Sequence, residues 1–447
     1  PRTVVGARRN SPLVVGLGEG ENFLGSDVVA FIEHTRTALE LHQDEVVEIT
    51  PDRVTVTDIK GLVVEREPYH VDWDASAAQK GGFSTFMEKE IHDQPTAVAD
   101  TLRGRMDEHG RLQLDGGMIH ETILNSVDKI IVVACGTAAY AGLVGRYAIE
   151  HWCRVPVEVE LAHEFRYRDP VVSVRTLVVA ISQSGETMDT IMAVRHAQQQ
   201  GAPVIAIVNS QGSTIAREAD AVLYTRAGPE IAVASTKAFL AQITAVFLLG
   251  IYLSELRGNK FPDEIESLLD QLDAIPAKVQ RVLDTSEPIR EVARTMANER
   301  TVLFLGRHVG FPVALEGALK LKELAYIHAE GFAAGELKHG PIALVEEGQP
   351  VFIVLPSPRG RESLHSKVIS NVQEVRARGA RTFVIAEEGD TEAENHAEQV
   401  FYVPSAPVLM TPLLSVVPLQ IFALELAAAK GYDVDQPRNL AKSVTVE

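Results

Sequence analysis

The segment Leu177-Val-Val-Ala-Ile-Ser-Gln-Ser-Gly-Glu-Thr187 joins an apolar run to a cluster of hydroxyl and amide side chains. Five consecutive apolar residues predict a strand buried on both faces, as in a parallel sheet covered by helices. The cluster at residues 182–187 then marks a turn into a helix, where side-chain donors and free backbone N–H groups could hold a phosphate without Lys or Arg. The alternative is an ordinary serine N-cap, and the hexapeptide alone favours neither interpretation.

Apolar strands alternating with amphipathic helices continue on both sides of this segment. The predicted strands are 130–134, 177–181, 204–208 and 221–224, and then 302–305, 351–355, 382–385 and 400–403. Each pass has four strands, with a Gly- or Ser-containing turn after the first and the second, which indicates an internal duplication. The predicted fold class is therefore α/β, with two doubly wound parallel-sheet lobes. Ligands of such sheets bind beyond the carboxyl ends of the strands.

The first 70 residues have a different pattern. Short β-branched runs at 13–16, 46–49, 54–57 and 62–65 are separated by Gly, Asp and Pro turn signals, which predicts an all-β piece that looks like the tail of a larger domain. A polar, Gly/Ala-rich stretch then suits a linker. The predicted domain boundaries are 1–71 for the β piece, 72–83 for the linker, 84–275 and 276–432 for the two lobes, and 433–447 for a C-terminal tail.

Composition excludes several classes of function. The chain has 447 residues, with 42 Lys and Arg against 61 Asp and Glu, so its formal charge is −19. This balance argues against nucleic-acid and anionic-membrane binding, and favours small molecules or other copies of the chain as partners. Two cysteines, Cys135 and Cys153, exclude a disulfide framework and favour a reducing compartment. The longest apolar run, around 241–253, falls short of a membrane span of about 20 residues, so we expect a cytoplasmic protein. No metal-ligand spacing is present, and no metal is expected.

A second constellation is Glu316, Lys320 and Glu323, which follow Pro312 at i, i+4 and i+7 on one face of a predicted helix. Two carboxylates flanking one ammonium could form an acid/base unit whose members tune each other's pKa. An ordinary exposed Glu-to-Lys ladder has the same spacing, and spacing alone favours that interpretation.

Two single residues complete the candidate set. His339 lies between glycines in a turn-forming stretch and could shuttle a proton near neutral pH, although a histidine in a loop is usually just solvated. Lys442 lies in an irregular tail after Pro437. Most tail lysines are solvated, but a desolvated one can form a Schiff base with a ketone.

Together these residues resemble the isomerase part of the glucosamine-6-phosphate synthase family, the glutamine:fructose-6-phosphate aminotransferases. The resemblance is carried by Cys135-Gly-Thr137, Ser182-Gln-Ser-Gly-Glu-Thr187, Val233-Ala-Ser-Thr-Lys237, the helix with Glu316 to Glu323, Glu336-Leu-Lys-His-Gly-Pro341 and the tail from Asp433 to Glu447. It implies two sugar-isomerase (SIS) lobes preceded by the end of an N-terminal nucleophile glutaminase domain. It also implies conversion of fructose 6-phosphate to glucosamine 6-phosphate, with nitrogen from glutamine through ammonia, in amino-sugar biosynthesis.

The resemblance assigns roles to matching positions. The substrate-binding residues it implies are Cys135, Gly136, Thr137, Ser182, Gln183, Ser184, Thr187, Val233, Ala234 and Ala441. Lys442 would form an imine with the C2 ketone, and Glu323 would move a proton between C1 and C2. Glu316 and Lys320 would position and tune Glu323, while His339 would assist ring opening from a neighbouring subunit, which implies a homodimer. No metal or organic cofactor is implied.

The departures from the family pattern are also informative. An N-terminal cysteine followed by Gly-Ile-Val-Gly is missing, so the chain is expected to begin inside the glutaminase domain and to use free ammonia or only interconvert phosphosugars. Ala138 stands where many members place a phosphate-binding serine. A sugar-phosphate-sensing module without catalysis, and a phosphosugar deglycase or isomerase of the same fold, remain alternatives.

Overall fold

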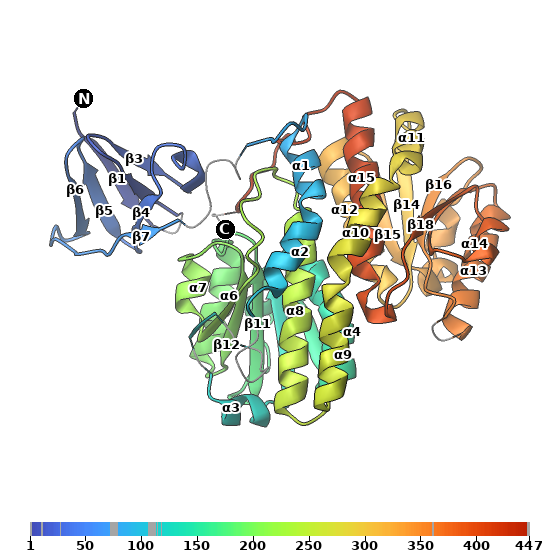
Figure 1. Ribbon diagram of the computed structural model, residues 1–447, viewed down its shortest axis with the longest axis horizontal. Helices are drawn as coiled ribbons and strands as arrows, with labels where there is room; N and C mark the ends of the chain where they lie inside the picture. The colour runs from blue at the N-terminus through green and yellow to red at the C-terminus, as the bar shows by residue number, and fades with distance from the viewer. Residues whose placement is uncertain are drawn as a thin grey trace.

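The computed structural model describes residues 2–9, 12–26, 28–71, 79–105, 113, 115–117, 119–359 and 362–444. The molecule has three parts in a row (Figure 1): a β-rich part in blue, a first α/β lobe that is mostly green, and a second α/β lobe in orange. Most of the proposed linker, residues 72–78, lies outside the described residues.

The β-rich part contains two small antiparallel sheets. One sheet has the order β1-β5-β6 and the other β3-β2-β4-β7. Their strands are β1 (Val4–Arg8), β2 (Val14–Leu17), β3 (Asn22–Gly25), β4 (Thr37–Glu40), β5 (Glu45–Ile49), β6 (Val54–Asp58) and β7 (Tyr69–His70). Residues 62–65 do not form the strand that was expected, because Val63 makes only an isolated bridge to Thr57.

The first lobe is built on a six-stranded sheet of order β10-β9-β11-β12-β13-β8, in which β8 alone is antiparallel. Its strands are β8 (Gly116–Gly117), β9 (Lys129–Ala134), β10 (Val157–Leu161), β11 (Thr176–Ser182), β12 (Val204–Val208) and β13 (Ala221–Tyr224). The four predicted strands are present. The strand β10 escaped prediction because Glu158 and Glu160 alternate with apolar residues, as suits a sheet edge rather than a buried centre.

The second lobe repeats this arrangement with a five-stranded parallel sheet of order β15-β14-β16-β17-β18. Its strands are β14 (Thr301–Gly306), β15 (His328–Ala333), β16 (Pro350–Val354), β17 (Arg381–Glu387) and β18 (Gln399–Val403). The edge strand β15 was also missed, because it mixes His, Glu and Gly with its apolar residues. In each lobe the first long strand lies second in the sheet, and the strand after the next helix takes the edge, which confirms the duplication.

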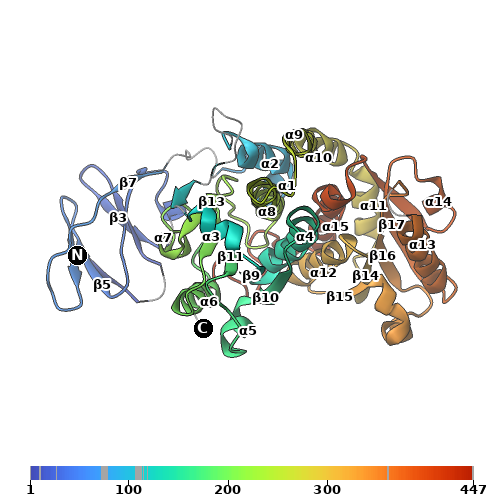
Figure 2. The same cartoon turned by 90° about the horizontal axis from the view of Figure 1, so that it is seen from below.

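Helices cover both faces of the two sheets, and some pack between the lobes (Figure 2). The helices are α1 (Phe86–His92), α2 (Gln94–Leu102), α3 (Glu121–Ser126), α4 (Gly136–Cys153), α5 (Ala162–Tyr167), α6 (Met188–Gln199), α7 (Thr214–Glu218), α8 (Lys237–Leu256), α9 (Pro262–Asp273), α10 (Ile275–Asp284), α11 (Glu287–Thr295), α12 (Gly310–Ala325), α13 (Glu362–Arg376), α14 (Thr391–Glu394) and α15 (Pro412–Ala429). Short 3-10 helices are η1 (Val28–Ala30), η3 (Ala334–His339), η4 (Pro341–Leu344) and η5 (Val408–Met410). Because α4 packs against α12, one hydrophobic core runs through both lobes.

Two helical segments correct the expectation that no apolar stretch reaches membrane-spanning length. Lys237–Leu256 and Val408–Ala429 are both long and apolar enough to cross a bilayer by length and composition alone. However, 83% and 78% of their most apolar windows are buried inside the protein. Core helices of a folded domain pass the same test, so these segments are weak evidence for a membrane span.

Candidate active site

The 182–187 loop lies where β11 ends and α6 begins, at the carboxyl edge of the first sheet. The Ser182 Oγ accepts the Gly185 N–H at 3.1 Å and lies 3.2 Å from the Thr187 Oγ1, while the Ser184 Oγ accepts the Glu186 N–H at 3.2 Å. Gly185 has a φ of +65°, and a Cβ there would come within 2.0 Å of the Ser213 Oγ. The loop is therefore a tight turn that gathers hydroxyl groups beside a helix N-terminus.

The C-terminal tail reaches this loop. The Met188 N–H, in the first turn of α6, donates to the Val444 carbonyl at 3.0 Å. Lys442 and Ser443 line the same cavity as Gln183 and Ser184, with a volume of about 900 Å³. Two candidates that are about 250 residues apart in sequence thus share one cavity, which spacing could not reveal.

Lys442 is held by the loop that precedes α8. Its Nζ donates to the Glu230 Oε2 at 2.7 Å and to the Ala232 carbonyl at 2.8 Å. The Glu230 side chain is buried, and its other oxygen accepts the Thr236 and Ala238 N–H groups. Burial alone would raise the pKa of Glu230, but the Lys442 ammonium and these hydrogen bonds hold it below its usual value. The terminal lysine is therefore aimed into the cavity by a buried carboxylate.

A second carboxyl group, Glu90 of α1, lies behind this pair. One oxygen accepts the Ile231 and Ala232 N–H groups, and the other is buried without a hydrogen-bond partner among the described residues. Burial and the neighbouring charge of Glu230 raise the pKa of Glu90 to about 8. Both glutamates were missed by the sequence analysis, since neither belongs to a recognisable spacing pattern.

The base of the tail is anchored by Asp435. Its carboxylate accepts the Phe86 and Met87 N–H groups at 3.0 and 2.9 Å, at the N-terminus of α1, where a negative charge is favoured. Its carbonyl accepts the Val233 N–H at 3.0 Å, so the tail also pairs with the 230–236 loop. These bonds fix the direction in which Lys442 leaves the anchor.

Glu316, Lys320 and Glu323 form a buried cluster on α12. The Lys320 Nζ lies 2.5 Å from the Glu323 Oε2, 3.4 Å from the Glu316 Oε1 and 3.0 Å from the Thr137 Oγ1. The Thr137 hydroxyl donates to Glu316 at 3.2 Å, so the first turn of α4 joins the cluster from the other lobe. Lys320 is 0% exposed, which rules out the surface-ladder interpretation.

The two carboxyl groups of this cluster lie in different electrostatic environments. Burial raises the pKa of Glu316 to about 8, and one of its oxygens has no hydrogen-bond partner among the described residues. Burial would lower the pKa of Lys320, but the Glu316 and Glu323 carboxylates together raise it above its usual value. Of the cluster's two carboxyl groups, Glu316 is thus the one whose ionised form burial disfavours, while Lys320 stays charged. Glu323, 22% exposed, is the cluster's most accessible carboxyl group.

Other candidate residues are dispersed. Val233 and Ala234 lie in the 230–236 loop beside Lys442, and Ala441 is exposed. Cys135 is half-buried at the end of β9, where burial raises the pKa of its thiol. Ala138 is buried on α4. His339 is exposed at the end of η3 in the second lobe and does not line the 900 Å³ cavity, so the described chain does not bring it to the other candidates.

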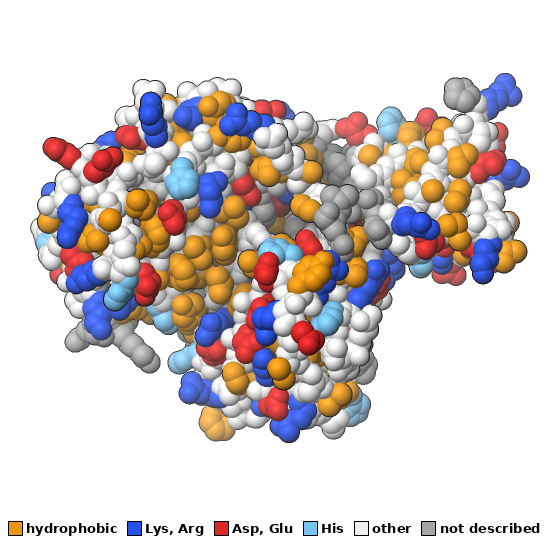
Figure 3. Space-filling model, turned by 180° about the vertical axis from the view of Figure 1, so that it is seen from behind, with side chains coloured by type: hydrophobic (Ala, Val, Ile, Leu, Met, Phe, Trp, Pro, Cys, Tyr) orange, Lys and Arg blue, Asp and Glu red, His pale blue; other side chains and the backbone are white. Residues whose placement is uncertain are grey.

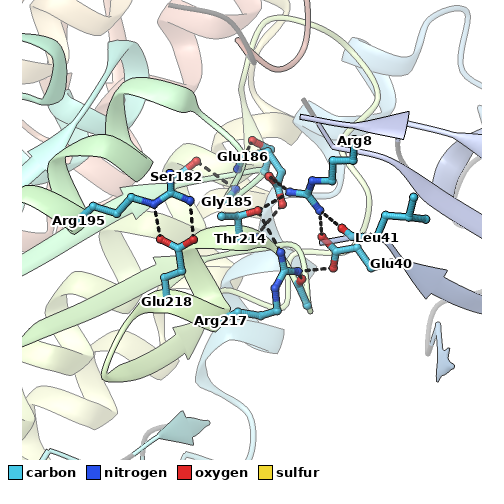
Figure 4. A network of polar contacts seen from close by, with 12 residues as sticks. Arg8, Glu40, Leu41, Ser182, Gly185, Glu186, Arg195, Thr214, Arg217 and Glu218 are labelled. Carbon is cyan, nitrogen blue, oxygen red and sulfur yellow. Dashed lines mark hydrogen bonds and ion pairs between the residues drawn. The ribbon is translucent and has the colours of Figure 1, made fainter. Parts of the chain in front are cut away.

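The β-rich part contacts the 182–187 loop directly (Figure 4). The buried Arg8 guanidinium at the end of β1 donates to Glu40 at 2.8 Å, to the Thr214 Oγ1 at 2.6 Å and to the Glu186 Oε2 at 3.4 Å. The Glu186 Oε1 accepts the Thr214 N–H at 2.7 Å. Arg217 completes the network by pairing with Glu40. Arg8 of the β-rich part therefore binds Glu186 and stabilises the 182–187 loop of the first lobe.

We expect Arg8→Met to loosen this loop, because it leaves a buried carboxylate without its cation, at a cost of about 3 kcal/mol. Amide hydrogen exchange in peptides covering residues 182–187 and 212–218 should then accelerate about 100-fold. Burial raises the pKa of Glu186, so ionised Glu186 destabilises the folded loop as the pH rises through that pKa. The difference between variant and wild type should be larger at pH 8 than at pH 5.

The control is Arg9→Met, since the Arg9 ion pair with Asp44 is exposed, with 64% and 43% of the two side chains accessible. Such a pair contributes about 1 kcal/mol or less, and its removal should leave exchange in the loop unchanged. Equal exchange in the Arg8 and Arg9 variants would show that Arg8 does not support the loop.

Comparisons with known proteins give consistent matches. The family model described as "SIS domain" matches residues 123–252 and 295–430. The chain is similar to the glutamine–fructose-6-phosphate aminotransferase (isomerizing) of Corynebacterium efficiens, with 70% identity over 447 residues, covering all of this chain and 72% of the relative. It is similar to the enzyme of the same name from Mycobacterium tuberculosis, with 60% identity over 452 residues and the same coverage.

Solved structures agree with these matches. The C-terminal domain of glucosamine-fructose-6-phosphate aminotransferase from Francisella tularensis superposes with a TM-score of 0.76 and 37% identity, covering 80% of this chain and all of that one. A glucosamine-6-phosphate deaminase from Thermotoga maritima has a TM-score of 0.60 at 21% identity, covering 80% and 99%, and at that identity it shows only a shared fold.

Proposed function

The chain belongs to the glutamine–fructose-6-phosphate aminotransferase (isomerizing) family, and from this premise we propose that its two SIS lobes convert fructose 6-phosphate and ammonia to glucosamine 6-phosphate and water. One observation carries the proposal: the terminal Lys442 lies in the same cavity as the hydroxyl-rich 182–187 loop. In the full-length protein the ammonia comes from glutamine. The β-rich residues 1–71 are proposed as the end of the glutaminase domain, and 433–447 as an active-site tail.

Substrate binding begins at the phosphate. Neutral hydrogen-bond donors lie beside the positive end of α6 and come from Ser182, Gln183, Ser184 and Thr187. These donors and the helix N-terminus act locally, so they suit a phosphate dianion although the chain has a net charge of −19. Cys135, Gly136 and Thr137 follow β9, the neighbouring strand of the sheet, and bound the sugar from that side. Phosphate binding at this edge leaves the carbonyl end of an open-chain sugar within the cavity that Lys442 lines.

The covalent step uses Lys442. Its neutral amine attacks C2 of the open-chain ketose, and water leaves as the imine forms. Ammonia then adds to C2 and releases the lysine. Glu323 removes a proton from C1 and returns one to C2, and the C1 hydroxyl proton passes to the imine nitrogen, so that C1 becomes the aldehyde and C2 carries the amine. Burial raises the pKa of Glu316, and the Lys320 ammonium lies closer to Glu323, at 2.5 Å, so Lys320 orients the Glu323 carboxylate.

Ring opening and assembly are proposed together. His339 is exposed on η3, where a second copy of the chain could receive it, so a homodimer would complete the site. Hydrophobic side chains gather on the face of the molecule seen in Figure 3, and an exposed hydrophobic patch is typical of a protein–protein interface such as a homodimer would need. The two free cysteines, one of them buried, suit a cytoplasmic location.

Two measurements test this function. Glucosamine 6-phosphate should form from fructose 6-phosphate at a rate that rises with added ammonia, and borohydride should trap a hexose adduct on Lys442. A rate indifferent to ammonia would favour a deglycase or a plain isomerase, and a folded protein that binds the sugar without any adduct would favour a sensor.

Glu230→Gln is expected to reduce kcat about tenfold while the KM for fructose 6-phosphate changes little, because Glu230 aims Lys442 and does not bind the phosphate. The initial rate of borohydride trapping on Lys442 should fall together with kcat, because the amine is no longer held in place by the carboxylate. Glu90→Gln is the matched control, since Glu90 has no hydrogen bond to the Lys442 Nζ. An unchanged kcat and an unchanged rate of trapping in Glu230→Gln would contradict the positioning role.

A further inference from the structure

A second cavity lies between the lobes, apart from the candidate active site. It has a volume of about 560 Å³, which is within the range of small-molecule sites. Its walls come from α4 and α9 in the first lobe and, in the second lobe, from the residues that follow β14, β16 and β18 and from α13. None of its lining residues lines the 900 Å³ cavity of the candidate active site.

The place of this cavity in the second lobe corresponds to that of the candidate active site in the first. The two sheets share the order β10-β9-β11-β12-β13 and β15-β14-β16-β17-β18, so β14 and β16 match β9 and β11. Arg307 and His308 follow β14 as Cys135 follows β9, and Pro356 and Ser357 follow β16 as the 182–187 loop follows β11. Each of the two duplicated lobes thus has a carboxyl sheet edge at which a ligand can bind, and the proposed reaction uses only the edge of the first lobe.

The charge of the cavity points to an anion. Its lining includes Arg307, Lys367, His151 and His308, and no Asp or Glu among the described residues, although the whole chain has 61 acidic residues. Neither Arg307 nor Lys367 has an ion pair with a described carboxylate. An adjoining cavity adds Lys278 and Arg359. Arg359 is ion-paired with Glu387, so an oxyanion would be bound by Arg307 and Lys367, for which the described part of the chain offers no ion pair.

The anchoring chemistry differs from that of the first lobe. The turn Leu355-Pro-Ser-Pro358 contains two prolines, which lack an N–H, so it cannot present the backbone donors of the 182–187 loop. An anion here depends on side-chain cations instead. The rest of the lining includes an apolar and aromatic wall, with Trp152, Leu268, Leu409 and Met410, and Tyr147 packs against His308 with 4.6 Å between ring centroids. A bare phosphate ion would leave that wall without a partner.

We propose that this inter-lobe cavity is a second ligand site, which binds a small organic phosphate whose body presents an apolar or aromatic face. Arg307 and Lys367 bind the phosphate, while the wall formed by Trp152 and Leu409 packs against the body. In the catalytic cavity, by contrast, neutral donors are proposed to bind the phosphate of a polyhydroxylated sugar. The two sites therefore differ in the groups that bind the phosphate and in the kind of ligand body that they accept.

The test uses 1-naphthyl phosphate as the probe and the indole of Trp152 as the reporter. Trp73→Phe in the full chain leaves Trp152 as the only tryptophan. We expect the probe to quench Trp152 emission saturably, in the presence or absence of saturating fructose 6-phosphate. Inorganic phosphate should bind at least tenfold more weakly than the probe.

Arg307→Gln with Lys367→Gln should weaken the probe about tenfold or more, and the exposed Lys367→Gln alone should weaken it without risk to folding. The matched control, Arg376→Gln with Arg378→Gln, removes two exposed cations from the same lobe and should leave affinity unchanged. The proposal is overturned if the probe does not quench Trp152, if fructose 6-phosphate displaces the probe, or if the cavity variants bind the probe as tightly as the control. It is also overturned if the affinity for the probe falls as the protein concentration rises, because a second copy of the chain would then cover the cavity.

Discussion

Lys442→Arg is expected to lower glucosamine 6-phosphate formation by about 10³-fold or more, because a guanidinium keeps the positive charge but cannot attack a ketone to form an imine. The substituted side chain could still pair with Glu230, so the tail should keep its place and the loss should appear in kcat rather than in KM. Borohydride should trap no hexose on the variant, and intact mass spectrometry measures that adduct directly.

The matched control is Lys430→Arg. Lys430 is the other lysine near the C-terminus; its Nζ donates to the Ala297 carbonyl at 3.0 Å and lies outside the catalytic cavity. Full activity and full trapping are expected for that variant. The substitution is verified by the mass of the C-terminal peptide. If the verified Lys442→Arg protein still formed product at a rate near that of the wild type, an imine could not be part of the mechanism.

The fold could be predicted from sequence wherever burial was complete. Strands such as 177–181 and 204–208 are covered on both faces, so their residues are uniformly apolar and easily recognised. The edge strands β10 and β15 were missed because one side of each meets solvent or a neighbouring loop, and their polar residues break the pattern. Residues 62–65 were misjudged in the opposite sense: Leu62 and Val63 are exposed and only Val64 packs against the core, so burial did not require a strand there.

The site could be predicted only where a motif or a resemblance marked it. Spacing placed Glu316, Lys320 and Glu323 on one face but could not reveal that the face is buried, since that follows from the packing of α4 against α12. Glu230 pairs with Lys442 across 212 residues of sequence, Glu90 binds the loop that follows Glu230, and neither glutamate belongs to a pattern. A charged residue whose partner is far away in sequence leaves no pattern in the residues around it, so only the tertiary structure identifies it.

The second large effect is expected for Glu323→Gln. An amide cannot accept the C1 proton, so product formation should fall about 10²- to 10⁴-fold, the usual contribution of a general acid–base group. Imine formation does not need this proton transfer, so the variant should still give a borohydride adduct on Lys442, unlike Lys442→Arg. The lysine and the glutamate are thereby separated into two chemical steps.

The decisive measurement for Glu323→Gln is exchange of the C1 hydrogen with deuterated solvent, which should slow in parallel with product formation. Glu346→Gln, an exposed carboxyl between η4 and β16, serves as the control and should exchange normally. If C1 exchange persisted in Glu323→Gln, the proton acceptor would have to be another group. Glu316 is then the remaining carboxyl group of the cluster, and its raised pKa, about 8, predicts that the residual rate should increase as the pH rises through that value, because only its ionised form can accept a proton.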